Sequence, residues 1–214
     1  MFIESLKKSN WKCCTLMCIG NLLIGIGVAV FKISGLGNDP FNGMSMAVSE
    51  LAGISYANIM VMFNVFLFLV EFIFGKKYIG LGTVVNGLLI GYIASFSYEF
   101  FVGYLGKPSG IAEKMLIMCC GVIVMSLGIS MYQMPEIGVA PYDSLSLMMA
   151  ERMKKIPYLW CRIFTDALCV VICWICGGLV GIGTVVSAFG LGTVVQFFNT
   201  HVTEKILEHI KPGA

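Results

Sequence analysis

Charged residues are scarce in this sequence. Only 12% of its 214 residues are Asp, Glu, Lys or Arg, whereas soluble domains carry about 25%. Hydrophobic residues make up 58% of the chain, and the polar stretch at its C-terminal end is too short to form a folded soluble domain. This composition excludes a soluble protein and gives no sign of a nucleic-acid partner. It predicts an integral membrane protein surrounded by a lipid bilayer.

The sequence also lacks the motifs of several enzyme classes. It contains no rhomboid-like G-x-S-G with a histidine, no H-E-x-x-H and no nucleotide-binding loop. The stretch "GLGND" superficially resembles the G-x-G-D of aspartyl intramembrane proteases, but its acid stands one residue late and no second acid has a matching motif. The two histidines, His201 and His209, both lie in the polar C-terminal stretch. We therefore expect no enzyme, no metal site and no cofactor.

Nine cysteines are present, and most of them lie inside apolar runs. Cys173 and Cys176 form a C-x-x-C, but this pair lies within a helix candidate, with no second pair and no nearby histidine. A zinc or redox site needs such additional ligands or an exposed loop. The pattern favours cysteine as a small apolar packing residue.

The apolar runs have the length of membrane-spanning helices. A hydrocarbon core of about 30 Å needs about 20 residues of α-helix. The runs are too long and too uniformly apolar for the alternating strands of a barrel. We predict an all-α fold with six transmembrane helices, at residues 14–34, 56–75, 79–103, 114–134, 157–177 and 179–199.

Two polar ends flank these runs. The lysines before the first run resemble the start of a signal peptide, but no A-x-A-like cleavage site follows, so we expect a retained first helix. Residues 200–214 are charged, and we predict a short cytoplasmic tail that forms an interfacial helix.

An internal repeat becomes visible when the chain is shifted by 101 residues. Pro40 then falls on Pro141, and "GLGTVV" at residues 80–85 falls on "GIGTVV" at 181–186. Matched glycines, such as Gly27 and Gly128, recur at the same offset. Apolar bias does not explain aligned glycine, proline and threonine at one fixed distance, so we predict a duplicated unit.

The repeat predicts how the chain is organised. We expect residues 1–213 to form a single membrane domain, with repeat 1 at residues 14–103 and repeat 2 at residues 114–199. Each repeat crosses the bilayer three times, and an odd number of crossings forces the second repeat to enter upside down. The many glycines at short spacings would let the helices of such a bundle approach closely.

Each repeat contains a short segment that follows a glycine and a proline. The segments at 40–53 and 141–154 would be about 21 Å long as helices, which is too short to cross the bilayer comfortably. We predict half-helices, either re-entrant or interfacial, whose first turn holds the proline and whose preceding turn holds Gly37 or Gly138. An eight-helix alternative, in which both segments cross, remains open.

The distribution of Lys and Arg predicts the orientation. With six spans, the basic residues are concentrated on one side, which should be the cytoplasm and should hold both termini. In the eight-helix alternative, Lys76 and Lys77 would lie outside and Lys107 and Lys114 would lie in the cytoplasm. The distribution of basic residues therefore does not distinguish six spans from eight. The basic residues expected in the cytoplasm are Lys7, Lys8, Lys12, Lys76, Lys77, Arg152, Lys154, Lys155, Lys205 and Lys211, against Lys107 and Lys114 outside.

The breaks before the half-helices create helix N-termini inside the protein, and such ends can hold a polar or anionic group. Asp39 is a suitable N-cap, whereas Ala140 at the matching position is not. Asn42 and Asp143 occupy equivalent positions and could cap their own helices or contact a substrate or cation. We include Ser144 in the candidate site. The alternative is an ordinary interfacial loop with solvated polar residues.

Polar side chains deeper in the apolar runs are costly, which makes them candidates for function. Asp166 lies near the middle of its span, with Arg162 one turn earlier, so the two can form an ion pair. Asn64 keeps a polar group at the matching depth in repeat 1. Asn86 could line a cavity or bind a neighbouring helix. Glu71, near the end of its span, is expected to snorkel toward water.

These residues carry a resemblance. The paired motif G-x-x-P-[FY]-[ND] followed by G-[LI]-G-T-V-V resembles the YczE/YyaS/YitT family of bacterial integral membrane proteins over nearly the whole chain. The resemblance implies a multi-pass protein of the bacterial cytoplasmic membrane. It implies no reaction, and no catalytic residues can be carried over.

The function that the sequence favours is a small-solute transporter or permease with a site between the two repeats. Because no ATP-binding motif is present, energy would come from a coupling ion or from a partner. The alternative is a membrane-embedded helper subunit of another complex, without transport of its own. A homo-oligomer is compatible with either function.

Overall fold

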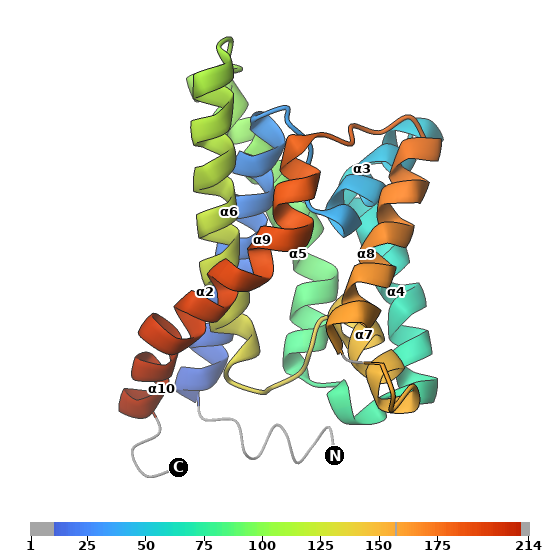
Figure 1. Ribbon diagram of the computed structural model, residues 1–214. Helices are drawn as coiled ribbons and strands as arrows, with labels where there is room; N and C mark the ends of the chain where they lie inside the picture. Colours follow the sequence, from blue (N-terminus) through green and yellow to red (C-terminus); the bar gives the residue numbers. More distant parts are fainter. Residues whose placement is uncertain (1–10, 157, 211–214) are drawn as a thin grey trace.

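The computed structural model describes residues 11–156 and 158–210, and in this part of the chain helices are joined by turns and loops, with no strand (Figure 1). The lysines at positions 7, 8 and 211 that were predicted to be cytoplasmic lie outside it. The helices are α2 (Trp11–Ile33), α3 (Pro40–Ala52), α4 (Tyr56–Phe74), the 3-10 turn η1 (Lys76–Tyr78), α5 (Leu81–Leu105), α6 (Ile111–Gln133), α7 (Pro141–Arg152), α8 (Tyr158–Ile175), α9 (Ile182–Phe198), the π-helical turn η2 (Asn199–Thr203) and α10 (Glu204–Ile210).

Five helical segments are long and apolar enough to cross a membrane: α2, α4, α5, α6 and the continuous run Ile182–Ile210. The protein is therefore a multi-pass membrane protein. The predicted span at residues 157–177 corresponds to α8, which is shorter, with 18 residues. It also carries two charged residues, Arg162 and Asp166.

The C-terminal residues do not form a separate interfacial helix, which differs from the prediction. Through the turn Asn199–Thr203, α10 continues α9. No glycine or proline occurs between residues 193 and 210, so nothing in this stretch breaks the helix. Thr203 is fully buried, and its hydroxyl lies 2.5 Å from that of Ser130 on α6. This contact holds the turn against the helical bundle.

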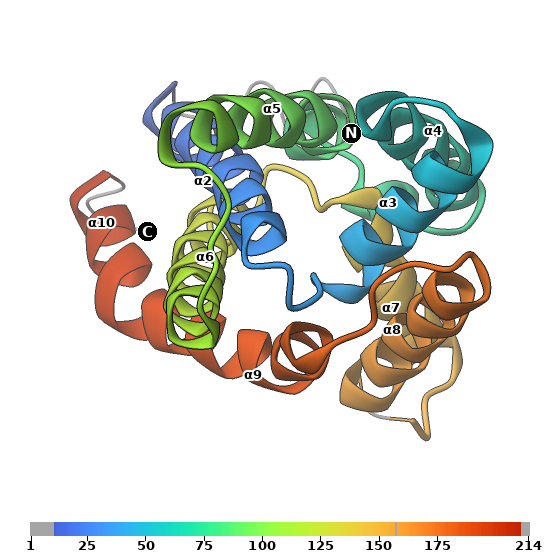
Figure 2. The same cartoon turned by 90° about the horizontal axis from the view of Figure 1, so that it is seen from above.

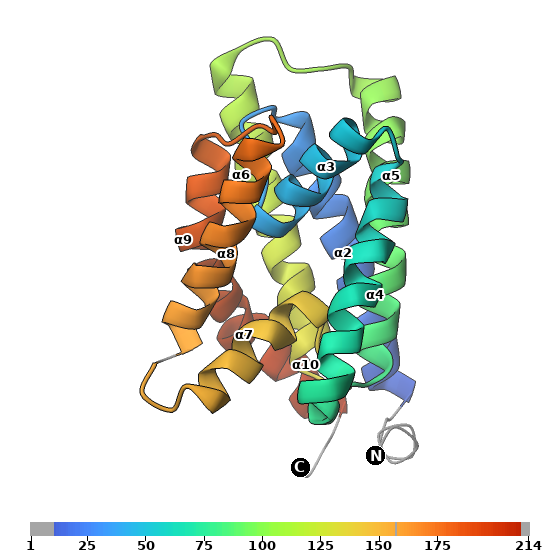
Figure 3. The same ribbon diagram turned by 90° about the vertical axis from the view of Figure 1, so that its right-hand side faces the viewer.

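The two short helices begin in the middle of the molecule and run to opposite ends (Figures 1 and 3). They have 13 residues (α3) and 12 residues (α7), or about 20 Å of helix, which is less than the hydrocarbon thickness of about 30 Å. Each has its proline in the first turn, and the side chain of Asp39 caps α3 as predicted. The predicted half-helices are thus present, with their N-termini at mid-depth.

The helices α2 and α6 run antiparallel and approach closely at glycines. A methyl group added at Gly27 would lie 2.6 Å from the amide nitrogen of Met125, and one added at Gly128 would lie 2.7 Å from that of Ile24. The prediction that glycines allow close helix packing is confirmed here. The two contacts are reciprocal under the 101-residue offset. Gly27 contacts Met125, and the residues that correspond to them, Gly128 and Ile24, contact each other in the same way.

A second pair of reciprocal contacts fixes the turns before the half-helices. The Gly82 amide donates to the Ile137 carbonyl at 2.8 Å, and the Gly183 amide donates to the Leu36 carbonyl at 2.8 Å. Both pairs are again related by the 101-residue offset. The following residues, Gly37 and Gly138, have φ of +112° and +117°, which only glycine adopts without strain. Each turn is therefore held by the first turn of a long helix from the other half.

The half-helices meet through their first turns. The rings of Phe41 and Tyr142, which occupy matching positions after the two prolines, stack with centroids 4.4 Å apart and an angle of 11°. Seen from above, α3 and α7 lie between α4, α8 and the pair formed by α2 and α6 (Figure 2). The centre of the molecule is therefore built from two loop-to-helix junctions rather than from a continuous helix.

Candidate functional site

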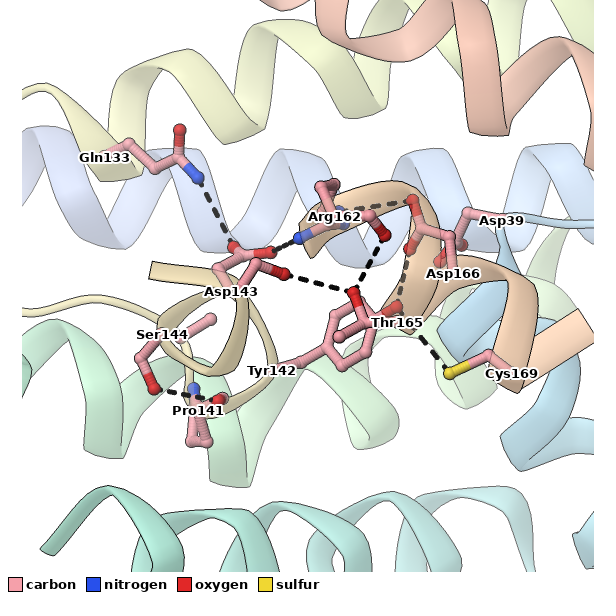
Figure 4. A network of polar contacts seen from close by, with 12 residues as sticks. Asp39, Gln133, Pro141, Tyr142, Asp143, Ser144, Arg162, Thr165, Asp166 and Cys169 are labelled. Atoms are coloured by element: carbon pink, nitrogen blue, oxygen red, sulfur yellow. Dashed lines mark hydrogen bonds and ion pairs between the residues drawn. The ribbon is translucent and has the colours of Figure 1, made fainter. Parts of the chain in front are cut away.

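A cavity of about 90 Å³ lies at this centre, beside the first turns of α3 and α7. The space is enough for several water molecules or for part of a small solute. The structure brings seven of the eight predicted site residues to its wall: Asp39, Asn42, Asn64, Asn86, Asp143, Arg162 and Asp166. The eighth, Ser144, does not line it. The Ser144 hydroxyl donates to the Pro141 carbonyl at 2.9 Å and points away from Arg162 (Figure 4).

Arg162 holds two carboxylates at once. Its Nη1 lies 2.5 Å from Oδ1 of Asp143, and its Nε lies 3.3 Å from Oδ2 of Asp166 (Figure 4). The guanidinium also lies over the Tyr142 ring, 4.7 Å from its centroid. The predicted Arg162–Asp166 pair is confirmed. The participation of Asp143 was not predicted, because it depends on how α7 packs against α8.

Two tyrosines and Gln133 also donate to these acids, with Gln133 Nε2 lying 3.3 Å from Asp143 Oδ2. Tyr142 Oη donates to Asp166 Oδ1 at 2.5 Å, and Tyr132 Oη donates to Asp143 Oδ2 at 2.5 Å. Sequence reasoning did not assign either tyrosine to the site. The aromatic residue that follows the proline in both repeats was a usable signal for Tyr142. For Tyr132, at the end of α6, the sequence carries no comparable signal.

The acid from the first half has a different environment. Asp39 accepts from the Asn42 amide nitrogen at 3.2 Å and from Asn42 Nδ2 at 2.7 Å. Tyr56 Oη in turn donates to Asn42 Oδ1. Within the described part of the chain, Asp39 forms no ion pair. The cavity wall therefore holds three carboxylates and one guanidinium.

Two asparagines on neighbouring helices face the cavity in different ways. Asn86 donates from Nδ2 to Asn21 Oδ1 at 2.9 Å and so links α5 to α2, one of the two roles predicted for it. Asn64 is only 4% exposed, yet its side chain hydrogen-bonds to no other residue that the structure describes. A buried amide without a partner is costly. Asn64 is thus available to bind water or a ligand in the cavity.

Glu71 does not snorkel to water, which corrects the expectation from its position in the span. Its side chain is fully buried, and neither carboxyl oxygen has a hydrogen-bond partner among the described residues. The reason is that the half-helix α7 packs against α4 near this point, where Gly75 contacts Met148. Glu71 is a candidate functional residue that the sequence analysis missed, although an acid inside an apolar run was a signal for it.

Comparisons with known proteins point to one family. The profile described as "Family of unknown function (DUF6198)" matches residues 11–200. An uncharacterized protein of Haemophilus influenzae is 26% identical over 199 residues, which cover 91% of this chain and 86% of the relative. The uncharacterized protein YyaS of Bacillus subtilis is 23% identical, with 91% of this chain and 96% of the relative covered.

The uncharacterized membrane protein YczE of Bacillus subtilis is 21% identical, with 83% of this chain and 81% of the relative covered. The resemblance to YyaS and YczE that the sequence motifs indicated is thus confirmed. No solved structure matches the chain.

Proposed function

The chain belongs to the DUF6198 family of unknown function, and from this premise we propose that it is a secondary carrier for a small, positively charged solute. The observation that carries the proposal is the central cavity, where three carboxylates face one guanidinium beside the N-termini of two half-helices. Ionisable groups at mid-depth in a membrane protein are expensive and typically mark a substrate or ion pathway. We propose no catalytic role.

The reciprocal contacts support an inverted-repeat architecture. We infer two repeats, at residues 14–103 and 114–199, that enter the bilayer in opposite orientations and give six spans when α8 is included. The antiparallel pair α2 and α6, the exchanged backbone hydrogen bonds at Gly82 and Gly183, and the opposite directions of α3 and α7 all support it. Transporters of this plan bind their substrates at the interface between repeats, next to broken helices.

The charge balance supports a cationic substrate. Arg162 is shared between Asp143 and Asp166, and Asp39 lacks a basic partner among the described residues. With all three acids ionised, the carboxylates exceed the guanidinium by two negative charges. The N-termini of α3 and α7 add about half a positive charge each, so about one negative charge is left, and an added cation relieves it. Apolar side chains complete the wall, including Met60, Met125 and Ile90. We infer a small amine with an apolar portion.

Binding can be tested by thermal shift on the purified protein with a panel of small amines and their uncharged or anionic analogues. We expect amines to raise the melting temperature of the wild type, and Asp39→Asn to weaken their binding about 30-fold or more, since removing a buried charge partner costs about 2–5 kcal/mol. Glu113→Gln, an exposed acid at the start of α6, is the matched control. Stabilisation by anions instead of amines would refute the substrate class.

Uptake of a binding amine into liposomes separates the two candidate functions. Uptake that Asp39→Asn abolishes supports the carrier. Binding without uptake favours the alternative, a membrane-embedded helper subunit of another complex.

The orientation is a further testable part of the proposal. We place both termini in the cytoplasm of a bacterium, because Lys12, Lys76 and Lys205 share one end of the molecule while Lys107 and Lys114 lie at the other. In a cysteine-reduced background, Lys76→Cys should resist a membrane-impermeant maleimide in intact cells and react after the cells are opened. Lys107→Cys should react in intact cells. The reverse pattern would overturn this orientation.

A further inference from the structure

A second polar position lies outside the cavity. Glu71 stands seven residues after Asn64, so both side chains project from one face of α4. Asn64 lines the cavity, whereas Glu71 lies two turns further along the helix and is fully buried. Neither Glu71 oxygen has a hydrogen-bond partner among residues 11–156 and 158–210. An isolated carboxylate in such a place is among the most expensive groups a protein can bury.

The charged groups on the nearest elements are engaged elsewhere. On η1, Lys77 pairs with Glu151 at the end of α7, and the Tyr78 hydroxyl donates to the same carboxylate at 2.6 Å. The Lys76 ammonium lies over the Phe72 ring. The other charged or titratable groups on elements packed against α4 fall into two sets. Three have other partners: Arg152 lies over the Phe74 ring, Asp143 pairs with Arg162, and Tyr92 donates to Asn58. The other three lie toward the opposite end of α4, near the far ends of α3 and α5: Glu50, Tyr98 and Glu99.

Among the residues that the structure describes, the Ser144 hydroxyl in the first turn of α7 is the polar group beside the Glu71 carboxyl, although no hydrogen bond joins them. That hydroxyl donates its only hydrogen to the Pro141 carbonyl at 2.9 Å. Donating to Glu71 instead would require the hydroxyl to rotate and give up this bond. A carboxylate is purely an acceptor and is satisfied here only at that cost, whereas a protonated carboxyl can donate its own O–H to Ser144 Oγ and leave the bond to Pro141 in place. The geometry therefore allows more hydrogen bonds with the neutral acid than with the anion.

We propose that Glu71 is a proton-binding site, and that its bound proton joins α4 to α7 through a hydrogen bond from the carboxyl to Ser144 Oγ. The proton comes from water and returns to it, so no further reactant is needed. The same turn of α7 carries Tyr142 and Asp143, which line the cavity. Release of the proton leaves a buried anion that Ser144 can satisfy only by giving up its bond to Pro141, so it favours movement of α7 away from α4.

The link between this proton and solute movement rests on the proposed function, whereas proton binding itself does not. If both are correct, Glu71 is the coupling site of the carrier, and it is physically separate from the solute site. Because the probe is the proton, the inference can be tested before any solute is known.

The first test compares melting temperatures between about pH 5 and pH 8 for the wild type, Glu71→Gln and Glu99→Gln. A group that holds its proton more tightly when folded stabilises the protein at low pH, and this stabilisation is lost as the pH rises. We expect the wild-type melting temperature to fall by roughly 5 °C over this range through Glu71. Glu71→Gln, a neutral isostere, should remove that part of the slope, while exposed Glu99→Gln should keep it.

The second test is infrared spectroscopy at neutral pH, which detects the C=O band of a protonated carboxyl group directly. We expect a band that Glu71→Gln removes and that Ser144→Ala shifts, because the hydrogen-bond acceptor is lost. A wild-type spectrum without this band, or an unchanged pH slope in Glu71→Gln, would overturn the inference. Failure of amines to bind the wild type would overturn the proposed function alone, because neither readout for Glu71 involves a solute.

Discussion

Replacing Arg162 by methionine should lower the stability of the folded protein by about 3–5 kcal/mol. The guanidinium lies between Asp143 and Asp166 and over the Tyr142 ring. Its removal leaves two half-buried or buried carboxylates close together without a counter-charge. Removing one partner of a buried ion pair in this way is much more destabilising than replacing all the partners by neutral residues. Denaturant unfolding in detergent, followed by circular dichroism, measures the loss.

The same cluster offers a rescue experiment and a control. The triple variant Arg162→Met, Asp143→Asn, Asp166→Asn removes all three charges and should recover most of the lost stability, because no carboxylate is then left unpaired. Arg152→Met, at the end of α7 and over the Phe74 ring, should cost less than about 1 kcal/mol. Equal losses for Arg162→Met and Arg152→Met would show that the cluster does not act as a unit.

A second large effect is expected at the contact between α2 and α6. An added methyl group in Gly128→Ala would lie 2.7 Å from the carbonyl oxygen of Gly20 and 2.7 Å from the amide nitrogen of Ile24. Both are backbone atoms of α2, so the helices must separate. Forcing additional volume into such a contact costs about 1–3 kcal/mol. Thermal unfolding in detergent should show a clear loss of stability.

Gly192 provides a matched control, because it is also a helical glycine but has open space around it, with no atom within 4 Å of an added methyl group. Gly192→Ala should be neutral or should stabilise the protein by up to about 1 kcal/mol, since alanine favours the helix. Reciprocity adds a further check. Gly27→Ala, at the position equivalent to Gly128, should resemble Gly128→Ala. A neutral Gly128→Ala would show that this contact tolerates separation.

The sequence was sufficient for those features that depend on local chemistry and length. Few charges and long apolar runs identified a membrane protein, and the glycine and proline positions identified both half-helices. The Asp39 cap and the Arg162–Asp166 pair followed from spacing within one segment. Such features need only the helical period and the rules for helix ends.

Features that depend on packing between distant segments were not predictable in the same way. Asp143 reaches Arg162 because α7 lies against α8, and Glu71 lies on α4 where α7 packs against it. Tyr132 joins the site from the far end of α6. The helical period gives the face of each residue, but it does not give the neighbour that covers this face. The continuation of α9 into α10 has a different origin: residues 193–210 contain no helix breaker, although their charges are typical of a polar tail.

The exchanged hydrogen bonds at the two turns also bear on biogenesis. When the first half has emerged from the ribosome, the Gly82 amide and the Leu36 carbonyl still lack the partners that the second half supplies. Unpaired backbone groups that the fold buries are unfavourable. The first half therefore stays unfinished during synthesis, and the final locking of both turns is a late event that requires the complete chain.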